Sequence, residues 1–327
     1  MYIQAIQEAL REEMRRDDTV FVIGEDVRAS LMGTTGGLVD DFGLKRVVNT
    51  PISEAGFTGL ATGAAMAGLR PVVEYEINTL QYVAMDQLAN QMARLRYMMG
   101  GQLNIPVTVR VAGAGGAPGM AAQHSDSTWA QLIHVGLKVV VPSTPYDVKG
   151  LLKTAIRADD PVVIYEPVAL YAMRGEVPED EYLVPLGVAD VKRPGTDVTV
   201  VATGHLVAEA LKAADELAAS QHLSVEVVDP RTLYPLDVET ILASVRKTGR
   251  LVVADDGYRF CSFASEVAAI ASEQAFDALK APIRRVTRPM VPVPNSLPLF
   301  QEVTPTGARI AAAISAVAGA GAPLASV

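Results

Sequence analysis

Cysteine is almost absent from this 327-residue sequence, because Cys261 is the only one and no disulfide can form within the chain. A single thiol is typical of reducing compartments, so we expect a cytoplasmic location. Long apolar runs are also missing: the longest, residues 57–69, is broken by threonines and glycines and is too short to span a bilayer. No cluster of Lys and Arg offsets the net charge of −9, which argues against nucleic-acid binding. We expect a soluble protein that acts at neither nucleic acids nor membranes.

What is present is ordinary globular composition, with 50% apolar and 20% charged residues and a length that suggests two average domains. Residues 2–14 already have the period of an amphipathic helix, with apolar side chains on one face. We therefore expect neither a signal peptide nor a transit peptide at this end.

Strand and helix patterns alternate along the chain, which predicts an α/β fold with two doubly wound, mostly parallel sheet domains covered on both faces. Residues rich in Pro, Gly and acidic side chains interrupt the alternation, and the last residues are rich in Ala and Gly. The expected organisation is a first domain at 1–180, a linker at 181–196, a second domain at 197–318 and a flexible tail at 319–327. Expected strands are 19–23, 71–74, 107–111, 138–141, 162–165, 198–202, 224–228, 250–254 and 283–286; expected helices are 54–69, 82–99, 125–134, 146–158, 207–218, 238–245, 263–276 and 306–317.

The segment from Thr50 to Gly63 is the most informative motif. Ser53 can cap the helix that follows Pro51, which places Glu54 in its first turn. Glycines recur on one face of this helix, and a helix that is apolar nearly all round needs cover on every side. We expect a subunit interface to supply part of that cover. Spacing alone favours a structural role for Glu54 as a residue placed by the helix dipole.

A family resemblance reverses that preference. Glu54 with the glycines after it resembles the signature of the pyrimidine-binding domain in thiamine-diphosphate enzymes. Further short motifs, in the order in which the family has them, extend the resemblance over the whole chain up to its tail. The chain is similar to the E1 component β subunit of 2-oxo acid dehydrogenases (the pyruvate, branched-chain 2-oxo acid and acetoin dehydrogenases). These subunits have transketolase-like pyrimidine-binding and C-terminal domains. The motifs that carry the resemblance are residues 24–27, 50–54, 86–87, 121–125, 136–140, 149–152, 161–163 and 231–237.

The resemblance implies a catalytic role for Glu54. Thiamine diphosphate reacts through C2 of its thiazolium, and a buried carboxyl at N1′ of the aminopyrimidine favours the imino tautomer whose N4′ removes the C2 proton. Glu54 is expected to be that carboxyl, with Glu25 in the same hydrogen-bonded shell and Leu80 packed against the pyrimidine ring. An ordinary core position is the alternative for Leu80.

His124 is the second catalytic candidate. It follows a glycine-rich loop after an expected parallel strand, where α/β sheets place ligand groups, and its ordinary pKa suits proton transfer near neutrality. In the family the matching histidine serves decarboxylation intermediates or acyl transfer to a lipoyl arm. His134 is expected to be structural.

The diphosphate half of a thiamine site is missing. Enzymes of this kind hold Mg²⁺ through a Gly-Asp-Gly motif and an asparagine further along the chain. The most similar segment of this sequence, residues 255–258, lacks both the first glycine and the asparagine. We therefore expect an α subunit to hold Mg²⁺. The resemblance also implies a K⁺ site on main-chain carbonyls around Ala155, Ile156, Ala158 and Asp160.

The favoured hypothesis is an oxidoreductase subunit: E1 β of an α2β2 heterotetramer that decarboxylates a 2-oxo acid or cleaves acetoin and passes the acyl group to lipoamide on an E2 acyltransferase core. The alternatives are half of a split transketolase or deoxyxylulose-phosphate synthase, and a non-catalytic assembly subunit. The chain departs from the family pattern at residues 133–136, which are one residue short, and at 290–295, where relatives dock E2. The substrate remains open.

Overall fold

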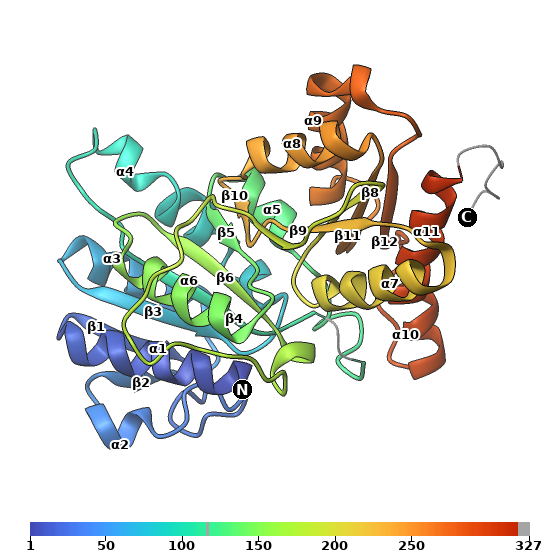
Figure 1. Cartoon of the computed structure of the whole chain (residues 1–327). Coiled ribbons are helices and arrows are strands. Elements are labelled where there is room, and N and C mark those ends of the chain that lie inside the picture. The colour runs from blue at the N-terminus through green and yellow to red at the C-terminus, as the bar shows by residue number, and fades with distance from the viewer. Residues whose placement is uncertain (116–117, 320–327) are drawn as a thin grey trace. The chain divides into compact units, whose positions relative to one another are not determined.

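The computed structural model describes residues 1–115 and 118–319, so residues 320–327 of the expected tail lie outside the described residues. The chain divides into two compact units, Met1–Leu186 and Gly187–Val327 (Figure 1). The division falls inside the segment expected to be a linker. Part of that segment, Asp190–Arg193, forms a strand of the second unit.

The first unit is built on parallel strands in the order β5-β6-β4-β3-β1-β2. Their residues are mostly β-branched and almost entirely buried, as expected for a parallel sheet covered on both faces. The bounds are β1 (Val20–Gly24), β2 (Val47–Asn49), β3 (Arg70–Tyr75), β4 (Thr108–Ala114), β5 (Lys138–Val140) and β6 (Val162–Pro167).

The strand order reverses between β1 and β3. The chain leaves β1 toward β2 on one side, then returns through α3 (Glu54–Met66) to β3 and continues to β4 on the other side. In open α/β sheets such a switch point leaves a crevice outside the carboxyl ends of the strands, where ligands bind. Gly24 ends β1 there, and a Cβ on it would meet the carbonyl oxygen of Glu74 at 2.5 Å.

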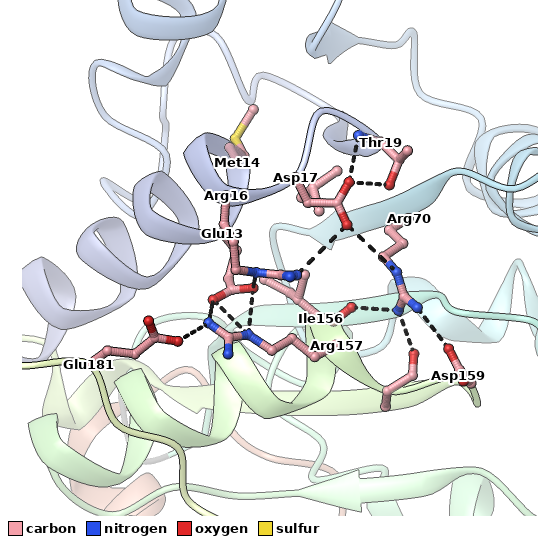
Figure 2. A network of polar contacts seen from close by, with 12 residues as sticks. Glu13, Met14, Arg16, Asp17, Thr19, Arg70, Ile156, Arg157, Asp159 and Glu181 are labelled. Carbon is pink, nitrogen blue, oxygen red and sulfur yellow. Dashed lines mark hydrogen bonds and ion pairs between the residues drawn. The ribbon is translucent and has the colours of Figure 1, made fainter.

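Two helices on one face of this sheet lie side by side, α1 (Tyr2–Arg16) and α6 (Pro145–Arg157) (Figure 1). Glu13 of α1 is fully buried and accepts hydrogen bonds from Arg157 at 2.6–3.1 Å and from Arg16 at 2.8 Å, as Figure 2 shows. A buried carboxylate held by two guanidinium groups fixes the register of the two helices.

Two expected helices of this unit differ from the structure. The stretch 82–99 is interrupted: η1 (Leu80–Tyr82) is a 3₁₀ turn, η2 (Gln87–Met92) is a π-helix and α4 (Leu95–Met98) is a single turn. The helix expected at 125–134 begins only at Trp129 (α5, Trp129–His134), because Thr128 uses its hydroxyl in hydrogen bonds with Gln81 and Tyr165. The short α2 (Leu38–Phe42) was not expected.

The second unit carries strands in the order β12-β11-β8-β9-β7, parallel except for the antiparallel edge strand β7. Its core lies between the sheet and α7 and α11, which pack side by side (Figure 1). The fold class predicted from the sequence is confirmed for both units. The bounds are β7 (Asp190–Arg193), β8 (Val198–Ala202), α7 (Leu206–Gln221), β9 (Val225–Asp229), β10 (Thr232–Tyr234), α8 (Val238–Thr248), β11 (Leu251–Tyr258), α9 (Phe263–Gln274), η4 (Phe276–Ala278), β12 (Arg284–Arg288), α10 (Leu297–Val303) and α11 (Gly307–Ala318).

Arg110 on β4 is the largest fully buried side chain of the first unit. Its guanidinium donates two hydrogen bonds of 2.7 Å to Glu166 of β6 and also binds Glu74 of β3, so one cation joins three adjacent strands. Two buried carboxylates would otherwise lie unpaired inside the sheet, which is costly.

Replacing Arg110 with Met should therefore lower the free energy of unfolding by about 3–5 kcal/mol, the usual cost of leaving buried partners of a broken ion pair uncompensated. Urea unfolding at neutral pH measures the change. Arg174→Met is the matched control, because Arg174 is exposed. A change at Arg110 no larger than at Arg174 would show that the cluster does not stabilise the sheet.

Candidate active site

Acidic residues from three places in the chain stand around the switch point of the first unit, where a ligand crevice is expected in a sheet of this kind. Glu25 directly follows β1, Glu54 is the first residue of α3, and Glu76 directly follows β3. Sequence reasoning named Glu25 and Glu54 but missed Glu76. Glu76 lies two residues beyond the expected strand 71–74, so its place at the end of β3 (Arg70–Tyr75) followed only from the structure.

Glu54 is buried, with 6% of its surface exposed, at the N-terminus of α3. Ser53 is the N-cap residue by position, but the expected capping bond is absent: its hydroxyl donates instead to the carbonyl oxygen of Pro51 at 3.0 Å. The carboxyl of Glu54 therefore sits in a first turn whose amide groups have no side-chain cap, a position where the helix dipole favours an acid.

Glu25 and Glu54 interact electrostatically across the crevice. Burial raises the pKa of Glu25, and the neighbouring charges of Glu54 and Asp26 raise it further, while the backbone amide of Ser53 donates to its carboxylate and acts against them. One carboxylate oxygen of Glu25 is buried and has no hydrogen-bond partner among the described residues. A proton donor from a ligand would satisfy it.

Tyr75, the last residue of β3, packs against α3. Its hydroxyl shares a 2.5 Å hydrogen bond with Thr58, and its ring lies 5.8 Å from that of Phe57. Burial raises the pKa of Tyr75 well above its ordinary value, and Glu54 adds to the effect. The hydroxyl stays neutral and positions the helix that carries Glu54.

His124 lies in the loop between β4 and α5, partly buried, with a buried Nδ1 that has no partner among the described residues. The loop is anchored to the segment after β3, because the Thr79 hydroxyl donates to the carbonyl oxygen of Gln123. His134, expected to be structural, is exposed at the end of α5.

The expected K⁺ carbonyls surround the C-terminal end of α6. Arg70 donates to the carbonyl oxygens of Ile156 (3.1 Å) and Ala158 (3.0 Å), as Figure 2 shows in part. The carboxylate of Asp160 binds Lys138 at 2.8 Å and also binds Arg96. The side chain of Leu80 lies outside the described residues, so its contact with a pyrimidine ring stays a prediction.

The string at 255–258 is part of β11 and does not resemble a diphosphate site. Asp256 pairs with Arg288 through two hydrogen bonds of 2.7–2.8 Å and is buried. In the described parts of the chain no three His, Cys, Asp or Glu side chains gather as they would around a metal ion. Helices long and apolar enough to cross a membrane are likewise absent from the described ranges.

One face of α3 is open to solvent in this chain. Leu60 is 57% exposed, Gly56 and Gly63 lie on the same face, and Ile52 just before the helix is 84% exposed. A Cβ added at Gly59 would meet the side chain of Gln87 at 2.8 Å. An apolar face of this kind is typical of a subunit interface.

Comparison with known families divides the chain as its fold does. Residues 1–173 match the transketolase pyrimidine-binding domain, and residues 187–310 match the transketolase C-terminal domain. A solved structure of a split-gene transketolase, an inactive β4 tetramer, superposes with a TM-score of 0.79 at 25% identity over 97% of this chain and 98% of that one. These findings define a two-domain protein of the transketolase type.

Curated relatives narrow the class. The β subunit of an acetoin:2,6-dichlorophenolindophenol oxidoreductase from Bacillus subtilis (strain 168) is 46% identical, over 94% of this chain and 93% of that one. The pyruvate dehydrogenase E1 β subunit of the same strain is 45% identical (94% and 97%), and its 2-oxoisovalerate dehydrogenase β subunit is 43% identical (92% and 93%). The chain belongs to the E1 β-subunit family of 2-oxo acid dehydrogenases. This confirms the resemblance and favours it over a split transketolase half or an assembly subunit.

Proposed function

We propose that this chain is the β subunit of a thiamine-diphosphate-dependent E1 enzyme that transfers an acyl group from a 2-oxo acid or acetoin to lipoamide. The observation that carries the proposal is the pairing of Glu54 with Glu25 in the switch-point crevice, where a buried carboxylate oxygen of Glu25 lacks a partner among the described residues. The relatives named as β subunits of an acetoin oxidoreductase, a pyruvate dehydrogenase and a 2-oxoisovalerate dehydrogenase support it.

The described residues fit the pyrimidine half of the cofactor. When bound, thiamine diphosphate supplies a nucleophilic carbon at C2 of its thiazolium. Glu54 would hold a proton at N1′; it is buried, and its charge acts on Glu25. Tyr75 and Thr58 fix the helix turn that carries Glu54, and Leu80 would lie on the ring.

His124 would act on the other side of the reacting centre. Its Nδ1, which has no partner among the described residues, can accept or donate a proton, and Thr79 anchors its loop by a hydrogen bond to Gln123. We assign it to proton transfer on the substrate or to the thiol of the lipoyl arm.

An α subunit would supply the Mg²⁺ and diphosphate contacts, in an α2β2 tetramer that covers the open face of α3. A K⁺ ion would bind the carbonyls of Ala155, Ile156, Ala158 and Asp160. A carbonyl oxygen has two lone pairs, so Arg70 does not exhaust the oxygens of Ile156 and Ala158.

An E2 core and its lipoyl domain complete the proposed set of partners. The second unit presents exposed apolar side chains around the segment where relatives dock E2, namely Met290, Val291, Leu297 and Leu299. The cytoplasmic location expected from the sequence stays a prediction.

The isolated chain should bind thiamine diphosphate weakly, because half of the contacts belong to the α subunit. Calorimetry with Mg²⁺ and the cofactor should detect tight binding only after the cognate α subunit is added. Tight Mg²⁺-dependent binding to the β chain alone would contradict the divided site.

His124→Ala should keep cofactor binding and tetramer assembly while overall acyl transfer falls by about 10²-fold or more, the usual loss when an acid–base group is removed. His134→Ala is the control, because that histidine is exposed at the end of α5. If the His124 variant loses tetramer in proportion to activity, so that each remaining tetramer is fully active, the residue is structural.

A further inference from the structure

Glu76 is a buried acid that the proposed reaction has not yet used. Only 6% of its surface is exposed, and its Oε1 is buried without a hydrogen-bond partner among the described residues. Glu74, two residues earlier, and Glu166 are also buried, but both bind Arg110. Nothing comparable holds Glu76, so its burial costs stability that the described contacts do not return.

The backbone brings Glu76 into the crevice. Gly113 on the neighbouring strand β4 has φ +79°, and a Cβ there would meet the carbonyl oxygen of Glu76 at 2.9 Å. Burial raises the pKa of Glu76 to about 7, and the charges of Glu74, Asp26 and Glu25 contribute. The charge of Glu25 thus acts on Glu76, and that of Glu54 acts on Glu25.

Asn78 lies beside it in the chain and is equally unsatisfied. It is fully buried, and neither its amide nitrogen nor its amide oxygen has a partner among the described residues. Thr79, which follows, has φ +90°, a rare conformation for a residue with a side chain, and its hydroxyl binds the loop of His124. Unsatisfied polar groups on a strained segment are typical of functional sites.

The charge around this segment favours a neutral ligand. The Arg110 guanidinium is engaged by Glu74 and Glu166, and the charges that act on Glu76 are those of acids, so a substrate carboxylate beside Glu76 would be repelled. The charged groups that act on Glu76 are Glu74 on the strand that leads to it, and Asp26 and Glu25 in the segment after β1.

We propose that Glu76 accepts the hydroxyl proton of a neutral 2-hydroxyketone such as acetoin, with Asn78 hydrogen-bonded to a substrate oxygen, and that the two residues select this substrate class over 2-oxo acids. The inference rests on the proposed function, and it chooses between the substrates that the family leaves open.

The cleavage step needs such a group. The bond between the carbonyl carbon and the carbinol carbon breaks, and its electron pair stays with the former carbonyl carbon. The carbinol O–H becomes the C=O of an aldehyde, so its proton must leave, and the Glu76 carboxylate takes it. A 2-oxo acid loses CO₂ at the same stage and needs no base there.

The test compares acetoin with pyruvate in the reconstituted α and β subunits, with dichlorophenolindophenol as electron acceptor. Wild type should prefer acetoin, and Glu76→Gln should lower kcat/KM for acetoin by about 10²-fold or more while changing that for pyruvate less than about tenfold. In wild type kcat/KM for acetoin should rise with pH through an apparent pKa near 7, the value to which burial raises that of Glu76, and the variant should lack this rise.

A second readout does not depend on activity. Because the folded-state pKa of Glu76 is raised from 4.5 to about 7, the folded protein loses stability relative to the unfolded chain as pH rises through this window, and the loss is complete above it. Glu76→Gln and Glu76→Met should therefore raise the melting temperature of the tetramer most above pH 7 and least near pH 5. Glu179→Gln, at an exposed glutamate, should do neither.

The outcomes separate the two claims. If no substrate is turned over with thiamine diphosphate, the proposed function fails and this inference with it. If wild type prefers pyruvate, or if Glu76→Gln leaves the ratio of acetoin to pyruvate unchanged, only the role of Glu76 is overturned. Should Glu76→Gln fail to assemble, Glu76→Met decides by the same ratio, and failure of both to assemble would make Glu76 structural and overturn its role.

Discussion

The arrangement of buried charges in the first unit depends on where one buried guanidinium lies. Arg110 joins β3, β4 and β6 by binding Glu74 and Glu166, so it neutralises the acids inside the sheet and none of those at its edge. Glu54 and Glu76 are buried and Glu25 is half-buried, at the carboxyl ends of the strands or at the start of α3. Burial and the charge of Glu54 raise the pKa of Glu25, and burial and neighbouring acids, Glu25 among them, raise that of Glu76. A fold that needed only stability would pair or remove them. Carboxyls that share or exchange protons are what the proposed chemistry requires.

The exposed surfaces of this chain fit an enzyme whose active site is shared between two different subunits. The described residues offer carboxyls, an imidazole and an apolar helix face, but no gathering of metal ligands and an Asp256 already bound to Arg288. Leu60 and its glycine neighbours are exposed on α3, the helix that begins at Glu54, so a partner that covers this face would contact the helix that carries Glu54. Assembly and catalysis would then depend on the same helix.

Much of this was predictable from sequence, because parallel strands buried on both faces have unmistakable apolar runs: 198–202 was predicted without error, and 71–74 within one residue at each end. Glu54 was proposed as catalytic from family motifs, because spacing alone favoured a structural role. His124 was proposed both from its glycine-rich loop after an expected strand and from the family resemblance. The π-helix at Gln87–Met92 was missed because its residues keep a helical pattern of polarity. Glu76 was missed because strand periodicity ends at Tyr75, and no pattern reports that the residue after a strand is buried without a partner.

The central claim is that Glu54 holds the proton that activates the cofactor, and exchange of the C2 proton tests it most directly. In the reconstituted tetramer, Glu54→Gln keeps the shape and one hydrogen bond but cannot move a proton. Exchange of the C2 hydrogen of bound thiamine diphosphate for deuterium should slow by about 10²–10⁴-fold, with cofactor affinity within about tenfold of wild type. Exchange at the wild-type rate would contradict the account and leave Glu54 as a first-turn helix residue.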